Sequence, residues 1–204
     1  MGFYSQVIFP RLCDLTLGRP LVAKHRRELL ANASGKILEI GFGTGLNLPY
    51  YSAHVRKIIA VDPNLGMHRL AQHRIKQAGI EVEQTALSGK RLPFEDDTFD
   101  SVVSTFTLCS IEDVDKALCE TYRVLKPGAH FLFLEHGLSP EPKIQKWQRR
   151  LNWLEIHLAD GCRLDRNIRR LIGAQPFSSV GIEEFDLDKT PKTHGHLYKG
   201  IARK

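Results

Sequence analysis

Residues 38–47 read Leu-Glu-Ile-Gly-Phe-Gly-Thr-Gly-Leu-Asn. Glycine occupies three alternate positions of this stretch, Gly41, Gly43 and Gly45. Because glycine has no Cβ, it suits a place where a strand turns sharply and the backbone passes close to a ligand. A second apolar run, residues 57–61, ends at Asp62. The two runs predict neighbouring strands of an α/β sheet, with a ligand bound at their carboxyl ends.

The residues around this turn indicate which ligand it holds. Asp62 is placed to accept hydrogen bonds from both hydroxyls of a ribose. The spacing G-x-G-x-G differs from the G-x-G-x-x-G of dinucleotide loops, in which a pyrophosphate meets a helix N-terminus. Glu39, two residues before the first glycine, would repel a pyrophosphate but suits the cationic amino group of S-adenosylmethionine. The pattern favours that cofactor, although such glycines also occur for packing alone.

Length and composition predict one globular domain. The chain has 204 residues, of which 42% are hydrophobic, enough for a sizeable core. No apolar stretch is long enough to span a bilayer and no signal peptide is evident, so we expect a cytoplasmic protein. The net charge of +6 fits a solvated face, or attraction to an acidic partner or an anionic lipid surface.

The cysteines predict no metal site. They have no C-x-x-C spacing and no histidine partners at zinc-finger intervals. We expect four reduced thiols, Cys13, Cys109, Cys119 and Cys162.

Hydrophobic periodicity predicts alternating strands and helices, and hence a mostly parallel sheet. Helical spacing covers residues 64–77 and 112–124, and Lys126-Pro127-Gly128 is expected to form a turn. Residues 180–187 and 196–202 look like an antiparallel hairpin at one edge. The remaining predicted strands are 36–41, 57–61, 80–85, 99–105 and 129–135.

The single domain, residues 1–204, divides into four expected parts. Its cofactor-binding core covers residues 36–137, and residues 174–204 form the C-terminal hairpin. N-terminal cover helices, residues 1–35, and an acceptor-side cover, residues 138–173, would lie over the carboxyl edge of the sheet, where ligands bind. The apolar stripe in residues 1–18 could instead only pack on the sheet.

Four motifs, in order, resemble those of the class I S-adenosylmethionine-dependent methyltransferases, of the methyltransferase type 11 group. They are Glu39–Gly45, Val61-Asp62-Pro63, Leu92-Pro93-Phe94 followed by Phe99-Asp100, and Arg123–Gly128. The resemblance implies a Rossmann-like fold: a seven-stranded, mostly parallel sheet with an antiparallel C-terminal strand and helices on both faces. It also implies S-adenosylmethionine as the cofactor.

A narrower resemblance points to the alkyl thiol methyltransferase branch. Its motifs are Thr107–Ser110, Glu135-His136 and Asp160–Arg166. Animal members of that branch carry an additional N-terminal membrane anchor. No such anchor is expected here, although residues 1–18 could contact a membrane peripherally.

The resemblance also implies roles for individual residues. The methionine part of the cofactor would be held by Glu39, Gly41, Gly43 and Gly45. The ribose side would be bound by Asp62 and Pro63. The base would pack against Met67, and its adenine edge would contact Ser88 and Gly89. Thr105 would either contact the methionine moiety or cap its strand. His136 is the candidate base or a hydrogen-bonded neighbour of the site, and Asp160 would orient it or the acceptor, or cap a helix near Asp165.

Several functions remain open from the sequence. The acceptor is expected to be a small molecule, either a thiol or an amine such as phosphatidylethanolamine. A nicotinamide-dependent oxidoreductase is disfavoured by the glycine spacing and Glu39. A cofactor-binding regulatory protein or a nucleic-acid binder is the non-enzymatic alternative, but no RNP-like motif or recognition helix is evident, so no nucleic-acid partner is expected.

Overall fold

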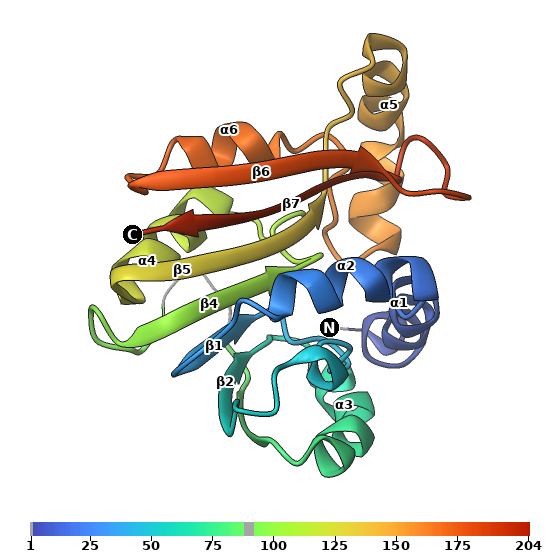
Figure 1. Cartoon of the computed structure of the whole chain (residues 1–204). Coiled ribbons are helices and arrows are strands. Elements are labelled where there is room, and N and C mark those ends of the chain that lie inside the picture. Colours follow the sequence, from blue (N-terminus) through green and yellow to red (C-terminus); the bar gives the residue numbers. More distant parts are fainter. Residues whose placement is uncertain (1, 88–91) are drawn as a thin grey trace.

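A seven-stranded sheet forms the centre of the protein (Figure 1). The computed structural model describes residues 2–87 and 92–204. The strand order is β3-β2-β1-β4-β5-β7-β6, and β7 runs antiparallel to both of its neighbours, β5 and β6, and so opposite to the other six strands. This confirms the predicted fold class, including the C-terminal hairpin.

The strands lie close to the predicted runs. The hairpin is β6 and β7, and it places β7 beside β5 with β6 at the edge. The bounds are β1 Ile37–Ile40, β2 Lys57–Val61, β3 Glu81–Thr85, β4 Phe99–Thr105, β5 Leu125–His136, β6 Ser179–Asp186 and β7 His196–Arg203.

One predicted turn takes a different form. Lys126-Pro127-Gly128 belongs to β5, which begins directly after the preceding helix. The pairing of β4 with β5 shifts its register between Phe99 and Ser101, and Gly128 has a φ of +79°. The predicted turn is therefore an irregularity within the first residues of β5.

Alternation along β5 divides the core into two layers. Phe131 and Phe133 point to one face of the sheet, where they pack with residues of α4 and α6. Leu132 and Leu134 point to the other face and pack with residues of α2 and α3. This period of two is what a strand covered on both faces requires, and all four side chains are fully buried.

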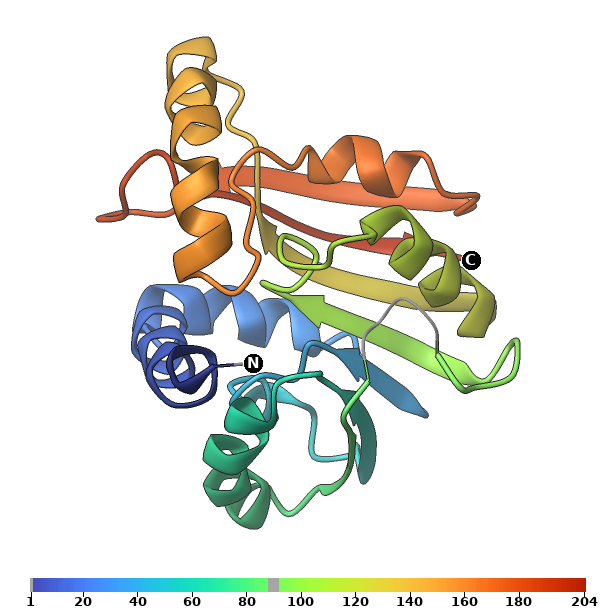
Figure 2. The same ribbon diagram turned by 180° about the vertical axis from the view of Figure 1, so that it is seen from behind.

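Helices cover both faces of the sheet, as Figures 1 and 2 show from opposite sides. Helices α4 and α6 lie on the face turned toward the viewer in Figure 2, and α2 lies on the opposite face. The helical segments are η1 Tyr4–Ile8 (π-helical), α1 Phe9–Leu17, α2 Pro20–Leu30, η2 Leu48–Tyr50 (3₁₀), α3 Leu65–Ala78, α4 Val114–Val124, α5 Pro142–Leu158 and α6 Ile168–Gly173.

Side-chain caps fix where the helices beside the carboxyl edge begin. The Asn64 Oδ1 accepts hydrogen bonds from the backbone N–H of Gly66 and Met67, so α3 begins at Leu65, shortly after the end of β2. Gly79 ends α3 in the left-handed conformation. Asp113 caps α4 in the same way as Asn64 caps α3, by accepting from the N–H of Lys116.

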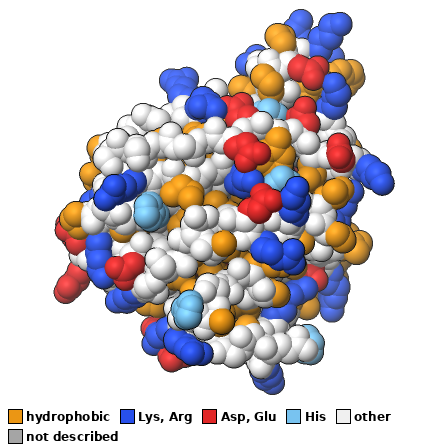
Figure 3. Space-filling model, viewed as in Figure 1, with side chains coloured by type: hydrophobic (Ala, Val, Ile, Leu, Met, Phe, Trp, Pro, Cys, Tyr) orange, Lys and Arg blue, Asp and Glu red, His pale blue; other side chains and the backbone are white. Residues whose placement is uncertain are grey.

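Only part of each cover segment lies outside the sheet layers, because α2 and α6 pack on the faces of the sheet. Helix α5 projects from the body of the molecule in Figure 1 and carries the exposed indoles of Trp147 and Trp153. Lys and Arg side chains are scattered over the face shown in Figure 3, with several on the projecting part. Across the described ranges, we find no helix with the length and apolar character needed to cross a bilayer.

Candidate functional site

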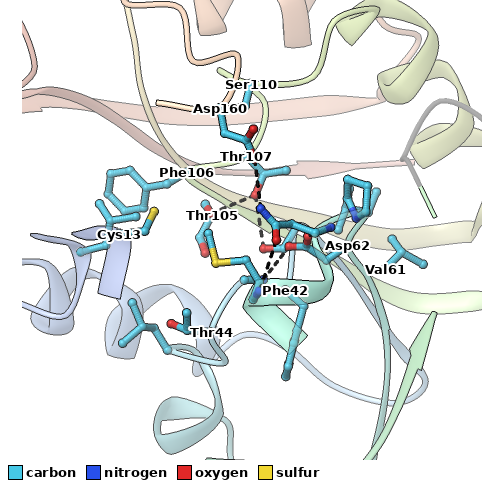
Figure 4. Close-up of a pocket in the computed structure, with 18 of the residues that line it drawn as sticks. Cys13, Phe42, Thr44, Val61, Asp62, Thr105, Phe106, Thr107, Ser110 and Asp160 are labelled. Atoms are coloured by element: carbon cyan, nitrogen blue, oxygen red, sulfur yellow. Dashed lines mark hydrogen bonds between the residues drawn. The ribbon is translucent and has the colours of Figure 1, made fainter. Parts of the chain in front are cut away.

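A cavity of about 250 Å³ lies at the carboxyl ends of β1, β2 and β4. Figure 4 shows Phe42 and Asp62 from the first two of these strand ends, Thr105 from the third, and Cys13 from α1 around it. Asp160, from the loop after α5, completes the lining. Residues of both cover segments therefore reach this edge of the sheet.

The glycine turn is held against the chain that leaves β4. Gly41 has a φ of +72°, and a Cβ at this position would lie 1.9 Å from the Thr107 Oγ1. Gly43, with a φ of +57°, has only the Gly41 carbonyl oxygen, 3.9 Å away, near the position of a Cβ. Gly41 and Gly43 line the cavity, whereas Gly45 closes the turn with a hydrogen bond from its N–H to the Phe42 carbonyl. The turn thus exposes bare backbone to the cavity.

Asp62 is a buried carboxylate on the cavity wall. Its Oδ2 accepts a hydrogen bond of 2.8 Å from the Gly43 N–H, and its Oδ1 accepts one of 2.8 Å from the Asn64 N–H. Burial raises the pKa of this carboxyl, against the two backbone hydrogen bonds. A carboxylate offers about four acceptor positions, so Asp62 retains capacity for two further donors.

Glu39 lies beneath the cavity rather than in its lining. The side chain is 1% exposed, and its carboxylate accepts hydrogen bonds of 2.8 Å from the Asn47 amide and 2.6 Å from the Tyr51 hydroxyl. Burial raises the pKa of Glu39 to about 7. The structure therefore places Glu39 where it positions Asn47 rather than where it faces the cavity directly.

Arg26 of α2 is a lining residue that the sequence did not indicate. Its Nη1 donates to the Asn47 Oδ1 at 2.5 Å and to the Thr105 Oγ1 at 2.8 Å, and the side chain is 3% exposed. Its Nε is buried and has no hydrogen-bond partner among the described residues. Burial lowers the pKa of Arg26. A buried guanidinium with an unsatisfied N–H beside a cavity suits an anionic group of a ligand.

Thr105 joins this network at the end of β4. Its hydroxyl accepts from both the Arg26 guanidinium and the Asn47 amide, and the residue also lines the cavity. Thr105 therefore lies at the carboxyl edge of the sheet and holds Arg26.

The remaining wall is mostly apolar. Cys13 belongs to this wall, and burial raises the pKa of its thiol to about 12, so it stays neutral. Pro63 and Met67 also line the cavity. Further apolar lining residues are Phe9, Leu17, Leu46, Leu87, Phe106 and Ile111. Ser88 and Gly89, expected at the adenine edge, lie outside the described residues.

Asp160 and His136 are not brought together. The Asp160 carboxylate accepts hydrogen bonds from the Ser5 hydroxyl at 3.0 Å and the Asn64 amide at 3.1 Å. Asp160 is exposed and lines the cavity, whereas His136 does not line it. Asp160 therefore joins the N-terminal cover to the start of α3 instead of orienting the imidazole. Nor does Asp160 cap a helix near Asp165, because Asn167 caps α6.

His136 lies with two cysteine thiols. Its Nε2 is 3.0 Å from the Cys162 Sγ, and the donor atoms of Cys109, His136 and Cys162 all lie within 4.8 Å of one another. A hydrogen bond from Cys162, together with the neighbouring imidazole, lowers the pKa of Cys109 well below its usual range. Burial opposes a charge on His136, but the Cys109 thiolate raises its pKa above the ordinary value. His136 is therefore paired with thiols rather than with Asp160 or the cavity.

Comparisons with known proteins agree with this geometry. A family model described as a methyltransferase domain matches residues 38–133. Thiol S-methyltransferase TMT1A of Homo sapiens is 32% identical over 184 residues, covering 79% of this chain and 71% of that protein. Thiol S-methyltransferase TMT1B of Rattus norvegicus is 34% identical over 151 residues, covering 72% of this chain and 62% of that protein, so the chain spans less than two thirds of the rat relative.

A bacterial relative matches more of the chain at lower identity. The phosphatidylethanolamine N-methyltransferase of Cereibacter sphaeroides is 28% identical over 189 residues, covering 91% of this chain and 88% of that protein. Its name places an amine, rather than a thiol, among the acceptors of similar proteins.

Solved structures share the fold at low identity. A methyltransferase of Bacillus halodurans has a TM-score of 0.69 and 16% identity, with 91% of this chain and 98% of that chain covered. Phosphoethanolamine N-methyltransferase 2 of Haemonchus contortus, in complex with S-adenosyl-L-methionine, has a TM-score of 0.64 and 15% identity, with 96% and 60% covered.

The buried Glu39 carboxyl makes stability depend on pH in a predictable direction. Its pKa is raised from 4.5 to about 7, so between these values the folded chain holds a proton that the unfolded chain has released. Unfolding then releases a proton, and stability falls as pH rises through this window. Relative to the Glu39→Gln variant, the wild type should lose up to about 1.4 kcal/mol of unfolding free energy per pH unit between about pH 5 and 7.

Urea unfolding at several pH values measures this difference, which should level off above pH 7. Parallel curves for the two proteins would contradict the buried, protonated state of Glu39.

Proposed function

This chain belongs to the class I S-adenosylmethionine-dependent methyltransferases, and we propose that it transfers the methyl group of S-adenosylmethionine to the sulfur of a small alkyl thiol. The cavity is the observation that carries the proposal. The glycine turn, the Asp62 carboxylate and the Arg26 guanidinium with its unsatisfied Nε line the cavity together with mostly apolar side chains. The thiol S-methyltransferases among its relatives support the choice of sulfur as the acceptor atom.

The chain's own residues fit an adenosyl cofactor in three places. Asp62 would accept from the two ribose hydroxyls, using the acceptor positions that Gly43 and Asn64 leave free. Arg26 would pair with the methionine carboxylate, which satisfies its buried Nε. Because Gly43 has no Cβ, the adenosyl chain can approach the backbone there. Pro63 and Met67 would contact the nucleoside.

Glu39 and Gly45 would act from beneath the cofactor. Glu39 holds the Asn47 amide, whose Oδ1 in turn accepts from Arg26. Thr105 accepts from the same guanidinium on its other side. We therefore assign Glu39 and Thr105 to the orientation of Arg26, and Gly45 to the turn that carries Gly43.

When bound, S-adenosylmethionine supplies a sulfonium methyl group that an acceptor displaces in line. The charges of the thiolate and of the sulfonium cancel as the methyl group is transferred. An apolar wall destabilises the two separate ions, because it removes water from them, and so it favours this step. Only a few per cent of a thiol with a pKa of about 8.5 is ionised at neutral pH. The site therefore needs a path for the thiol proton.

For that path we assign Asp160 as the catalytic residue. It lines the cavity and is exposed, so a proton accepted there passes to solvent. His136 is better suited to positioning the turn after β4 through Cys109 and Cys162, since it lies outside the cavity lining.

A second acceptor has its own support. The bacterial phosphatidylethanolamine N-methyltransferase matches 91% of this chain. The N-terminal cover carries exposed apolar side chains, including Phe3 at 73% and Leu15 at 75% exposure, which fit peripheral contact with a lipid surface. An amine head group is therefore the alternative acceptor.

The activity test separates the two acceptors. The protein is incubated with S-adenosylmethionine and either 2-mercaptoethanol or phosphatidylethanolamine vesicles, and S-adenosylhomocysteine and methylated product are quantified by mass spectrometry. We expect the methyl thioether from the thiol. Methylation of the lipid alone would contradict the thiol proposal, and no product from either would contradict both.

Replacing Asp62 should abolish tight cofactor binding. Two hydrogen bonds to a charged acceptor contribute roughly 1.5 kcal/mol or more each, so Asp62→Ala should weaken S-adenosylmethionine binding at least about 100-fold. Calorimetric titration measures this, with circular dichroism to verify folding. Asp188→Ala, an exposed site in the loop before β7, is the control. Unchanged affinity would remove Asp62 from the site.

Replacing Arg26 should affect only ligands that carry a carboxylate. Arg26→Gln is expected to weaken S-adenosylhomocysteine binding by about tenfold or more. Binding of 5′-methylthioadenosine, which lacks the amino-acid part, should stay the same. If both ligands lose affinity equally, Arg26 supports the fold of the site rather than the carboxylate.

A further inference from the structure

Three soft donor groups converge beside the cavity without taking part in it. Cys109 lies in the turn after β4, His136 is the last residue of β5, and Cys162 lies in the loop after α5. Both cysteines are buried, with 2% and 9% exposure, and both are free thiols. Across the described part of the chain, this is the group of His, Cys, Asp or Glu whose ligand atoms come close enough to hold a metal ion.

The backbone around these donors is fixed by hydrogen bonds. The Arg163 N–H donates to the Cys109 carbonyl at 3.0 Å, and the Cys162 N–H donates to the Ala159 carbonyl at 3.0 Å. The Arg166 guanidinium donates to the carbonyls of Leu108 and Ile111, on both sides of Cys109. The three donors therefore come together through the fold and need little further ordering to bind an ion.

The protein alone does not satisfy the histidine. The His136 Nδ1 is buried and has no hydrogen-bond partner among the described residues. The other ring nitrogen, Nε2, has the Cys162 Sγ as its contact at 3.0 Å. One side of the imidazole therefore faces sulfur, which is a zinc ligand, and the Nδ1 on the other side is the atom left without a partner.

We propose that Cys109, His136 and Cys162 bind one zinc ion. Two thiolates and an imidazole are a ligand set that zinc prefers, whereas calcium and magnesium require oxygen. For tetrahedral zinc with ordinary bond lengths, the ligand atoms lie roughly 3.5 to 3.8 Å apart. The observed spacing, from 3.0 Å up to 4.8 Å, brackets that value.

Zinc here would join two segments that border the cavity to the end of β5. The turn after β4 carries the lining residues Thr107 and Ser110, and the loop after α5 carries Asp160. The Ser110 Oγ lies 3.5 Å from the Cys109 Sγ, so the ion would lie directly behind this part of the wall. Zinc takes thiolates and a neutral imidazole as ligands, so the protons that these three side chains carry leave to solvent when the metal binds. The proposal does not depend on which acceptor the enzyme methylates.

Metal binding by the untagged full chain tests the proposal. The reduced, metal-free protein is titrated with Zn²⁺ against a chromogenic chelator, and separately with Co²⁺, whose thiolate complexes give a charge-transfer band in the near ultraviolet. We expect one equivalent of zinc per chain, a thiolate-to-cobalt band, and a higher unfolding temperature with zinc.

Variants of the cysteines provide the controls. Cys109→Ser and Cys162→Ser should each bind zinc on the order of 100-fold more weakly or worse. Cys119→Ser replaces an exposed thiol on α4 that hydrogen-bonds to Gln175, and this variant should bind zinc as the wild type does. Because a serine variant could fail to fold, circular dichroism is recorded for each, and the cobalt spectrum of the wild type stands independently of them.

Two results would overturn the proposal. One is that the reduced wild type takes up no zinc and shows no cobalt band. This includes the case in which the same protein, once oxidised, forms a disulfide between Cys109 and Cys162. The other is equal zinc binding in all three variants. Neither assay contains S-adenosylmethionine or an acceptor, so failure here is distinct from failure of the proposed methyl transfer.

Discussion

The buried hydrogen-bond network between Glu39 and Arg26 is the constraint on which the site depends. It connects β1, the 3₁₀ segment η2, helix α2 and the end of β4 through the Asn47 amide and the Thr105 hydroxyl. A buried carboxylate and a buried guanidinium are each costly to remove from water unless they are hydrogen-bonded. The network offsets that cost, and it holds α2 of the N-terminal cover at one distance from the sheet.

Steric contact sets the other side of the cavity. The absence of a Cβ at Gly41 lets Thr107 approach the glycine turn, and the Thr107 N–H is in turn held by the Glu135 carboxylate at 2.9 Å. Glu135 also accepts from the Ser104 hydroxyl, and burial raises its pKa to about 8. The ends of β1, β4 and β5 are thereby fixed against each other by two buried carboxyl groups, Glu39 and Glu135.

The sequence predicted what depends on local pattern. The strand runs, the glycine turn, Asp62 and the C-terminal hairpin are each encoded within one short segment, and the structure confirms their positions. Thr105 was placed at the correct edge for the same reason, because it ends a predicted strand.

The rest depends on contacts between distant segments. Arg26 lies on a helix whose pattern indicates only a buried face, and its partners are 21 and 79 residues away. The thiol–imidazole cluster combines Cys109 from the turn after β4, His136 from the end of β5 and Cys162 from the loop after α5. No spacing along the chain reveals it. His136 ends β5 and Asp160 follows α5, but the sequence pattern does not set the direction of either side chain. Asp160 bonds to Ser5 and Asn64 rather than to His136.

A crystal structure of the protein with S-adenosylhomocysteine tests the central claim most directly. The account predicts the ribose hydroxyls on the Asp62 carboxylate and the homocysteine carboxylate on the Arg26 guanidinium, with the sulfur facing the apolar wall near Asp160. An adenosyl group bound elsewhere, or bound here in the reverse direction with Arg26 still unsatisfied, would contradict it.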